Sequence, residues 1–166
     1  MSPRSSTAAP PAATPRVSGC TCFRLRRLTR RVTQHYDRAL APAGLRVTQF
    51  SLLSALERDV RGSIPMSELA TLLDLERTTL TRNVAPLVER GWVEVIGGAD
   101  ARSRDVRITT DGRAARAAAI PYWRAAQDGL EQLLGKGRTA ILHELLDDTL
   151  GRVRSGDLQP APRRPA

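Results

Sequence analysis

The chain has 166 residues, enough for one domain with additional helices, and its 41% hydrophobic content can build a core. Its net charge of +9 comes from 26 basic residues, 25 of them arginine, against 17 acidic ones, which favours a polyanionic partner such as nucleic acid. No apolar run approaches the roughly 20 residues of a membrane-spanning helix, and the N-terminus lacks the apolar middle of a signal peptide. We therefore expect a cytoplasmic protein that makes no membrane contact.

Residues 1–18 and 155–166 have the composition of tails. Both are rich in proline among small residues, so neither can bury a core and both are predicted to be disordered. Between them, residues 19–154 are predicted to form a single domain.

This domain is predicted to begin with a long helix, Cys20–Ala41. Its apolar residues recur at spacings of three and four, as expected for one helical face, and they are Leu25, Leu28, Val32 and Tyr36. A proline and a glycine end this helix at positions 42 and 44. A second helix, Thr48–Asp59, is predicted to follow, with Thr48 as its N-cap.

Two further helices are separated by a short turn. Ser67 is predicted to cap a third helix that ends at Leu73, and the fourth helix covers Arg77–Arg90. The turn between them is Asp74–Glu76. Pro86 lies inside the fourth helix, where it removes one backbone donor and should bend the axis.

An alternating segment, Trp92–Ile96, is predicted to be a strand, and Asp105–Thr109 is predicted to return antiparallel to it. The connection, Gly97–Arg104, has two glycines that permit a tight turn and a charged tip. Helix, turn, helix and hairpin in this order are typical of a winged helix-turn-helix, in which one helix enters a major groove of DNA and the hairpin loop enters the neighbouring groove. The expected fold class is mainly α with a small β-hairpin wing.

Two more helices complete the expected domain. Thr110 is predicted to cap a fifth helix, Asp111–Leu134, which Pro121 interrupts. The sixth helix, Arg138–Arg154, carries an apolar stripe. The first, fifth and sixth helices exceed what a small winged domain needs to close itself, so their apolar stripes must pack against something else.

The ordered series of motifs resembles the MarR family of bacterial transcriptional regulators. The matching segments are SELATLLDLERTTLTRNVAPLVERGWV (Ser67–Val93), DARSR (Asp100–Arg104) and ITTDGR (Ile108–Arg113). The resemblance implies a two-fold homodimer with a DNA-binding part at about 48–109. It implies dimerisation helices at about 20–41, 111–134 and 138–154. In the family, small aromatic or phenolic ligands, or oxidants, lower DNA affinity from the cleft between these helices and the winged domain.

The fourth helix carries the residues expected to read DNA. A recognition helix needs short polar and long basic side chains in its N-terminal half, and here these are Thr78, Thr79, Thr81, Arg82 and Asn83. The opposite, buried face is predicted to consist of Leu80, Val84, Leu87 and Val88. Three threonines within four residues are poor helix formers with no structural reason to cluster, which favours a DNA contact over an ordinary solvated helix.

The tip of the wing carries Arg102 and Arg104, and arginine is favoured in a narrow minor groove, where the potential is most negative. Asp100 and Arg102 match an Asp-x-Arg feature of the family, in which the aspartate orients the arginine. The alternative is a charged, exposed hairpin without a ligand.

Cys22 is followed by Phe23, and Tyr36 lies fourteen residues later. This resembles the organic-hydroperoxide-sensing members of the family, in which a reactive cysteine precedes a phenylalanine and a tyrosine at this spacing bonds the thiolate. Cys20 could then resolve a sulfenic acid on Cys22. The alternatives are that both cysteines are small buried hydrophobes, or that they bind a metal with His35, which the tight Cys-x-Cys spacing disfavours.

We therefore expect a homodimeric DNA-binding transcriptional regulator, a repressor of a palindromic operator. Its inducer is a small aromatic ligand or, alternatively, an oxidant sensed by Cys22. A winged-helix module for protein–protein contact would have a non-basic recognition helix and wing, whereas both are basic here. The chain shows no phosphate-binding loop and no spacing typical of a catalytic triad, so neither an enzyme nor a cofactor is expected.

Overall fold

The computed structural model describes residues 19–98 and 103–156. The chain divides into two compact units, residues 1–34 and residues 35–166. The predicted tails lie outside the described residues, apart from residues 155–156, and so do Asp100 and Arg102 of the predicted wing. Of the first unit, the structure describes mainly the N-terminal turns of helix α1 (Thr21–Leu40), in which almost every side chain is exposed.

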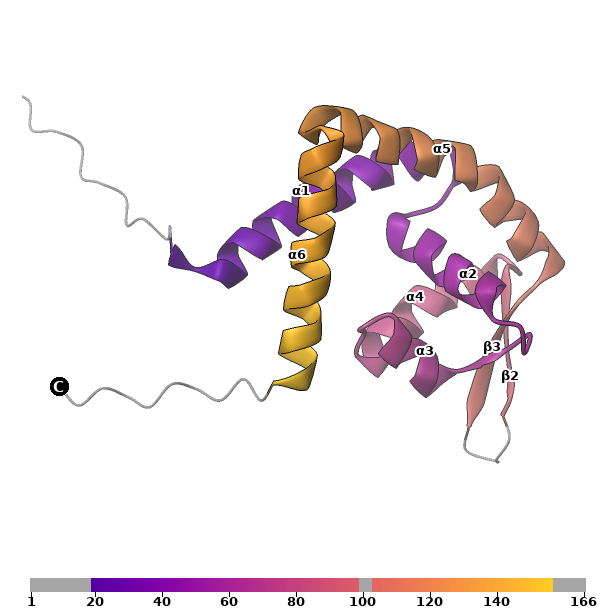
Figure 1. The fold of residues 1–166 in the computed structure, drawn as a ribbon. Coiled ribbons are helices and arrows are strands. Elements are labelled where there is room, and N and C mark those ends of the chain that lie inside the picture. The colour runs from indigo at the N-terminus through magenta and orange to yellow at the C-terminus, as the bar shows by residue number, and fades with distance from the viewer. Residues whose placement is uncertain (1–18, 99–102, 157–166) are drawn as a thin grey trace, which may run out of the picture. The chain divides into compact units, whose positions relative to one another are not determined.

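The second unit contains a three-stranded antiparallel sheet with the order β1-β3-β2 (Figure 1). The strands are β1 (Ile64–Pro65), β2 (Val93–Gly97) and β3 (Arg104–Ile108). The predicted hairpin and the mainly α fold class are confirmed, and β1 is an addition to them. With two residues, one of them a proline, β1 is too short to show the alternation by which a strand is recognised in a sequence.

Three helices pack with this sheet around one core. They are α2 (Val47–Arg58), α3 (Met66–Leu72) and α4 (Arg77–Glu89), and Figure 1 shows them grouped beside β2 and β3. The core is mostly leucine and valine from every element of the group; its fully buried members include Leu52, Leu53, Leu69, Leu80, Leu87, Val93 and Val106.

The prediction that Thr48 caps the second helix is wrong. The helix begins one residue earlier, at Val47, and Arg46 occupies the N-cap position. The free backbone donors find partners elsewhere: the Val47 N–H donates to Asp37 Oδ1 at 2.8 Å, and the Arg46 N–H donates to Gln49 Oε1 at 3.0 Å. Asp37 belongs to the last turns of α1, so a contact between two helices replaces the local cap.

The predicted N-caps of the third and fifth helices, Ser67 and Thr110, are also wrong. Ser67 lies inside α3, because Pro65 ends its pairing with Asp105 in the sheet and the helix starts at once at Met66. In helix α5 (Thr110–Leu134) the cap is Thr109 rather than Thr110. The Thr109 hydroxyl oxygen accepts a hydrogen bond from the Gly112 N–H at 3.0 Å, which Thr110 does not do.

Helix α5 leaves the sheet at Thr109 and runs past Pro121 without ending, and α6 (Lys136–Ser155) folds back from its far end (Figure 1). Gly135, with φ +81°, makes the reversal, and α6 starts directly after it at Lys136, two residues before the predicted start at Arg138. The predicted stripe of α6 is present and exposed; its side chains are 42–59% exposed and are Ile141, Leu145, Leu146, Leu150 and Val153.

Among the described residues, no helix combines the length and the apolar character needed to cross a membrane.

Candidate nucleic-acid interface

Helix α4 separates its polar side chains from its apolar ones. Leu80, Val84 and Leu87 are buried in the core, while the predicted reading residues Thr78, Thr79, Thr81 and Arg82 are exposed and Asn83 is half-buried. Val88, predicted to be buried, is 41% exposed, because it follows Leu87 by about 100° around the last turn of the helix. The N-terminal half of α4 therefore presents a polar surface to a ligand.

Arg82 and Thr81 on this surface differ in the hydrogen-bond donors that they have available for a ligand. Arg82 makes no ion pair with any described residue, so its five N–H donors are available to a base edge or a phosphate. The Thr81 hydroxyl donates to the Arg77 carbonyl at 2.9 Å, which leaves its oxygen to accept but not to donate.

The turn before α4 is held in an unusual conformation. Asp74 has φ +50°, and aspartate is one of the few non-glycine residues that adopt this left-handed region readily. Its carboxylate accepts hydrogen bonds from the Arg154 guanidinium of α6, one of them from Nε at 3.2 Å, and forms an ion pair with it. This ion pair joins the end of α6 to the turn that positions the start of α4.

The wing is defined up to its tip. Glu94 and Arg107 face each other across β2 and β3 and form an ion pair of 2.6 Å, and the Gly98 N–H donates to the Ser103 carbonyl at 3.1 Å. Of the predicted wing residues, the structure places Arg104, which is exposed on β3. The carboxylate of Glu94 already neutralises Arg107, so Arg104 is the wing arginine better suited to a phosphate or a minor groove.

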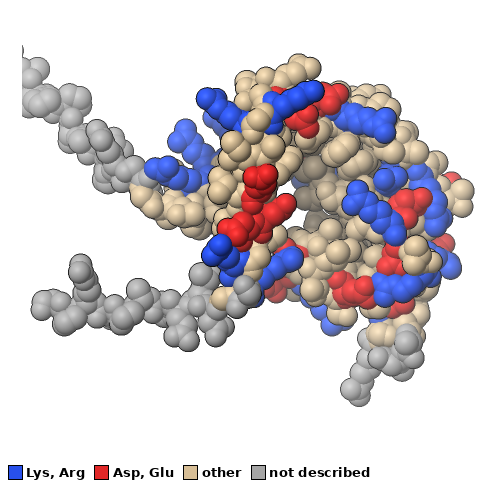
Figure 2. Space-filling view, in the orientation of Figure 1, with Lys and Arg blue, Asp and Glu red and all other residues tan. Residues whose placement is uncertain are grey.

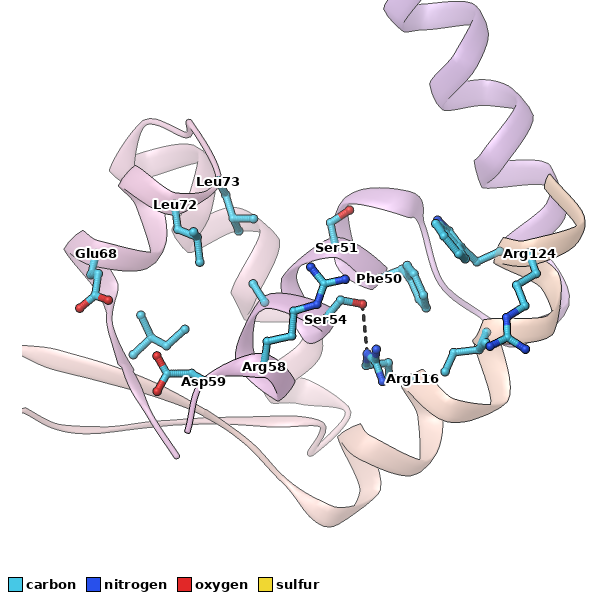
Figure 3. Close-up of a pocket in the computed structure, with 14 residues that line it drawn as sticks. Phe50, Ser51, Ser54, Arg58, Asp59, Glu68, Leu72, Leu73, Arg116 and Arg124 are labelled. Carbon is cyan, nitrogen blue, oxygen red and sulfur yellow. Dashed lines mark hydrogen bonds between the residues drawn. The ribbon is translucent and has the colours of Figure 1, made fainter. Parts of the chain in front are cut away.

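A groove lies between α2, α3 and α5, with a volume near 700 Å³ (Figure 3). At one end the rings of Phe50 and Trp123 stack with centroids 5.9 Å apart. Arg116 Nε donates to Ser54 Oγ at 3.1 Å, and Figure 3 shows the Arg58 side chain on the same side of α2 as Ser54.

The charge of this groove favours an anion. Its lining includes three arginines, Arg58, Arg116 and Arg124, and two acids, Asp59 and Glu68. Both acids form ion pairs with Arg61, at 2.5 and 2.6 Å. The hydrogen bonds from the Arg61 side chain lower the pKa of Asp59 and of Glu68, so both stay ionised and already neutralised at neutral pH.

None of the residues of this groove was predicted from the sequence as part of a ligand site. A signal was available in α5, where Arg116, Ile120, Trp123 and Arg124 recur at spacings of three and four and so share one face of the helix. The contribution of α2 and α3 depends on tertiary packing and has no local signal.

The predicted sensor residues are placed differently from one another. Cys20 and Cys22 are both exposed, so neither is the buried hydrophobic residue of the alternative interpretation. The Phe23 N–H donates to Cys20 Sγ at 3.4 Å. Tyr36 is buried and donates a hydrogen bond to Gln127 Oε1; burial and then the charge of Glu131 raise its pKa. Within the described part of the chain, no three metal-ligating side chains gather into a site.

The fold and the exposed polar face of α4 are those of a winged helix-turn-helix protein. The profile of the MarR family matches residues 43–103. The chain belongs to the MarR family, which confirms the predicted resemblance.

Individual relatives agree with this assignment. The HTH-type transcriptional regulator YwoH of Bacillus subtilis is 32% identical over 82 residues, which are 49% of this chain and 58% of YwoH. The chain thus spans less than two thirds of that relative's length. The transcriptional regulator MosR of M. tuberculosis, solved in complex with DNA, is 39% identical, and the match covers 81% of this chain and 99% of MosR with a TM-score of 0.67.

Two further structures in complex with DNA are similar. The transcriptional repressor CouR, bound to a 23-mer duplex, is 27% identical with a TM-score of 0.71, over 80% of this chain and 94% of CouR. A cysteine-to-serine mutant of E. coli MarR, bound to operator DNA, is 29% identical with a TM-score of 0.65, over 78% and 95% of the two chains.

Proposed function

We propose that the protein is a homodimeric repressor that binds a palindromic operator and is released by a small aromatic ligand. The observation that carries the DNA contact is α4, whose threonines and Arg82 are exposed while Leu80 and Leu87 anchor the opposite side in the core. Thr78, Thr79, Thr81, Arg82 and Asn83 would reach base edges and phosphates in a major groove. DNA complexes among the relatives support a DNA partner over a protein partner.

The wing would contact the neighbouring minor groove through Arg104 and Arg102. Arg104 is exposed on β3. Arg102 lies outside the described residues, two positions earlier in the sequence, and the family resemblance gives Asp100 the role of orienting it. Arginine in a narrow minor groove adds affinity through the more negative potential there.

The homodimer rests on the apolar stripe of α6. Five large apolar side chains that are 42–59% exposed form a surface that soluble monomers rarely leave open. The occupant we propose is the same stripe of a second copy, because a two-fold dimer also supplies the second α4 that a palindrome requires.

The ligand would bind in the groove between α2, α3 and α5. The stacked rings of Phe50 and Trp123 offer an aromatic surface, and the arginines Arg58, Arg116 and Arg124 favour an anionic group such as a carboxylate. The groove lies between α5 and two helices of the DNA-binding part, α2 and α3. A ligand bound there would shift these helices and, with them, α4.

A second candidate inducer is an oxidant. It is favoured by the exposure of Cys22 in the first turn of α1, where the helix N-terminus stabilises a thiolate. An organic hydroperoxide would convert Cys22 to a sulfenic acid and leave as its alcohol, and Cys20 of the other copy would then condense with it to a disulfide and water.

The DNA contact is tested by selecting bound duplexes from a random pool and measuring their affinity. Arg82→Ala should weaken binding to the selected sequence by about 1–3 kcal/mol and relax specificity, whereas Arg104→Ala and Arg102→Ala should each lower the salt slope by about one. Equal losses on selected and random DNA for Arg82→Ala would make Arg82 a phosphate contact. A wild-type protein that selects no sequence would refute the function.

The dimer is tested with a matched pair of substitutions in α6. Leu145→Asp places a carboxylate in the stripe, and Ala140→Asp places the same group on the opposite, exposed side of the helix. By sedimentation, Leu145→Asp should be monomeric and Ala140→Asp dimeric. A dimeric Leu145→Asp variant would exclude the stripe as the interface.

The two inducers are separated by their response to different chemicals. With a phenolic acid such as 4-hydroxybenzoate, wild type and Cys22→Ser should both release DNA, and Arg116→Gln should respond only at higher concentration. With an organic hydroperoxide, release by wild type and not by Cys22→Ser would show oxidant sensing instead.

A further inference from the structure

The positive charge of the chain is concentrated at its N-terminus. Residues 1–34 contain no acidic residue, and Asp37 is the first in the sequence. Their seven arginines are Arg4, Arg16, Arg24, Arg26, Arg27, Arg30 and Arg31. Residues 35–166 carry 19 basic and 17 acidic residues, so seven of the nine net positive charges lie outside the unit that contains the winged helix-turn-helix.

Four of these arginines share one side of α1. Arg26 and Arg30 are four residues apart, as are Arg27 and Arg31, so the two pairs lie side by side on the helix. All four are exposed, and we refer to them as the arginine face. The apolar residues Leu25, Leu28 and Val32 lie on the opposite side by the same periodicity. Figure 2 shows blue side chains on the N-terminal turns of α1 without red ones among them.

This arrangement costs helix stability. Arg26 and Arg30, like Arg27 and Arg31, are like-charge pairs at the i, i+4 spacing, which is destabilising. No acidic residue of the first unit can offset the repulsion, in contrast with α6, where Arg152 pairs with Asp148 at 2.8 Å. Codon preference could replace lysine by arginine but would not remove every carboxylate from 34 residues. An anionic partner would turn the repulsion into a gain.

We propose that the arginine face binds the phosphate backbone of double-stranded DNA, without reading its sequence, as a contact separate from α4 and the wing. The proposal rests on the proposed function, because it takes the duplex to be the polyanion that the protein meets. A guanidinium matches two phosphate oxygens with two parallel N–H donors, which lysine cannot do. A duplex carries one charge per about 1.7 Å of its axis, so one turn of α1, about 5.4 Å, always finds several phosphates within reach.

An anionic membrane surface is the competing partner, and the DNA complexes of similar proteins favour the duplex over it. A helix that lies in a membrane surface inserts its apolar side beneath the headgroups, so both sides of the helix are used. DNA requires the arginine face alone and leaves Leu25, Leu28 and Val32 for packing against protein.

The test measures the full-length protein on a random-sequence 30-bp duplex by fluorescence anisotropy over a range of salt concentrations. One variant replaces Arg26, Arg27, Arg30 and Arg31 by glutamine, and a second replaces the same four by lysine. A matched pair removes two charges from either helix: Arg30→Gln with Arg31→Gln in α1, and Lys136→Gln with Arg138→Gln in α6, where both side chains are also exposed.

The four-glutamine variant should lose at least about ten-fold in affinity, and its slope of log K against log salt should fall by about 3–4, close to 0.9 per phosphate contact. The lysine variant should keep most of the slope, and the α1 double variant should lose more of it than the α6 double variant. Independently of any substitution, the duplex should protect the arginines of residues 26–31 in wild type from phenylglyoxal, read by mass spectrometry.

An unchanged slope in the four-glutamine variant together with unprotected arginines would overturn the proposal. If Arg82→Ala still weakens selected DNA in that case, the proposed function stands and only the arginine face fails. If wild type binds no duplex at all, the proposed function itself fails. Loss of binding to vesicles containing phosphatidylserine, with DNA binding intact, would assign the face to a membrane and also overturn the proposal.

Discussion

Gly112 lies where α5 meets the sheet, and its replacement by alanine tests how closely the two are packed. A Cβ atom at this position would lie 2.0 Å from the Trp92 carbonyl oxygen and 2.9 Å from both the Trp92 carbonyl carbon and Ile108 Cγ1. Two of these three atoms belong to the backbone, so no change of rotamer can relieve the contact. Either the start of α5 or the backbone at Trp92, which directly precedes β2, must move by roughly 1 Å.

The magnitude follows from three contributions. Overpacking of a well-packed site costs typically about 1–3 kcal/mol. The shift also strains the 3.1 Å hydrogen bond from the Thr109 N–H to the Trp92 carbonyl, worth about 1 kcal/mol. Alanine recovers about 0.5–1 kcal/mol because glycine is the poorer helix residue. We expect a net loss of about 1–3 kcal/mol for Gly112→Ala, equivalent to roughly 3–10 °C in Tm.

Gly129→Ala in the same helix is the matched control. Its Cβ would lie 3.7 Å from His35 Cε1, an ordinary contact, so the helix propensity of alanine should stabilise this variant by up to about 1 kcal/mol. Thermal and urea unfolding followed by circular dichroism would compare the two. If Gly112→Ala is as stable as Gly129→Ala, the close contact between α5 and Trp92 does not exist as described.

Three other substitutions test single interactions. Thr109→Ala removes an acceptor for the Gly112 N–H and a donor to the Gly91 carbonyl and should cost about 0.5–2 kcal/mol in urea unfolding, with Thr109→Ser close to wild type. Arg61 lowers the pKa of Asp59 and Glu68, so its contribution to stability is present at neutral pH and lost as the pH falls through these lowered values; in acid titrations of unfolding, Arg61→Gln should show a weaker loss below about pH 4, and an identical acid profile would contradict this. Tyr36→Phe should cost about 0.5–1.5 kcal/mol through loss of the bond to Gln127 and leave any response to hydroperoxide intact, whereas an abolished response would place Tyr36 in the sensor.

The sequence predicted those features that depend on local periodicity. The exposed and buried sides of α4, the hairpin and the apolar stripe of α6 each repeat with the spacing of their element, and each was placed correctly apart from Val88. The predicted caps of α2, α3 and α5 are wrong for different reasons. In α5 the adjacent hydroxyl residues Thr109 and Thr110 compete for the same role, and in α3 the helix starts directly after a strand that ends at Pro65. In α2 the deciding partner, Asp37, lies ten residues earlier, where no local rule looks for it.

The groove and the tie between Asp74 and Arg154 could not be predicted, because their residues meet only after folding. Asp74 and Arg154 are 80 positions apart in the chain, and the partner of the Arg116 guanidinium, Ser54, is 62 positions away. The net charge of +9 indicates a basic protein, and the division of the chain after residue 34 shows that most of this charge belongs to residues 1–34.

That separation bears on how the protein would distinguish its operator from other DNA. Phosphate contacts form on every DNA sequence and weaken steeply as the salt concentration rises. Base contacts by α4 form only on the correct sequence and depend far less on salt. If the arginine face supplies most phosphate contacts, salt suppresses random binding and operator binding by similar factors, and the ratio of the two affinities stays set by α4. Replacing the arginine face should then lower both affinities while preserving their ratio, whereas Arg82→Ala should change the ratio at every salt concentration. A change in the ratio after replacing the arginine face would mean that α1 takes part in sequence recognition.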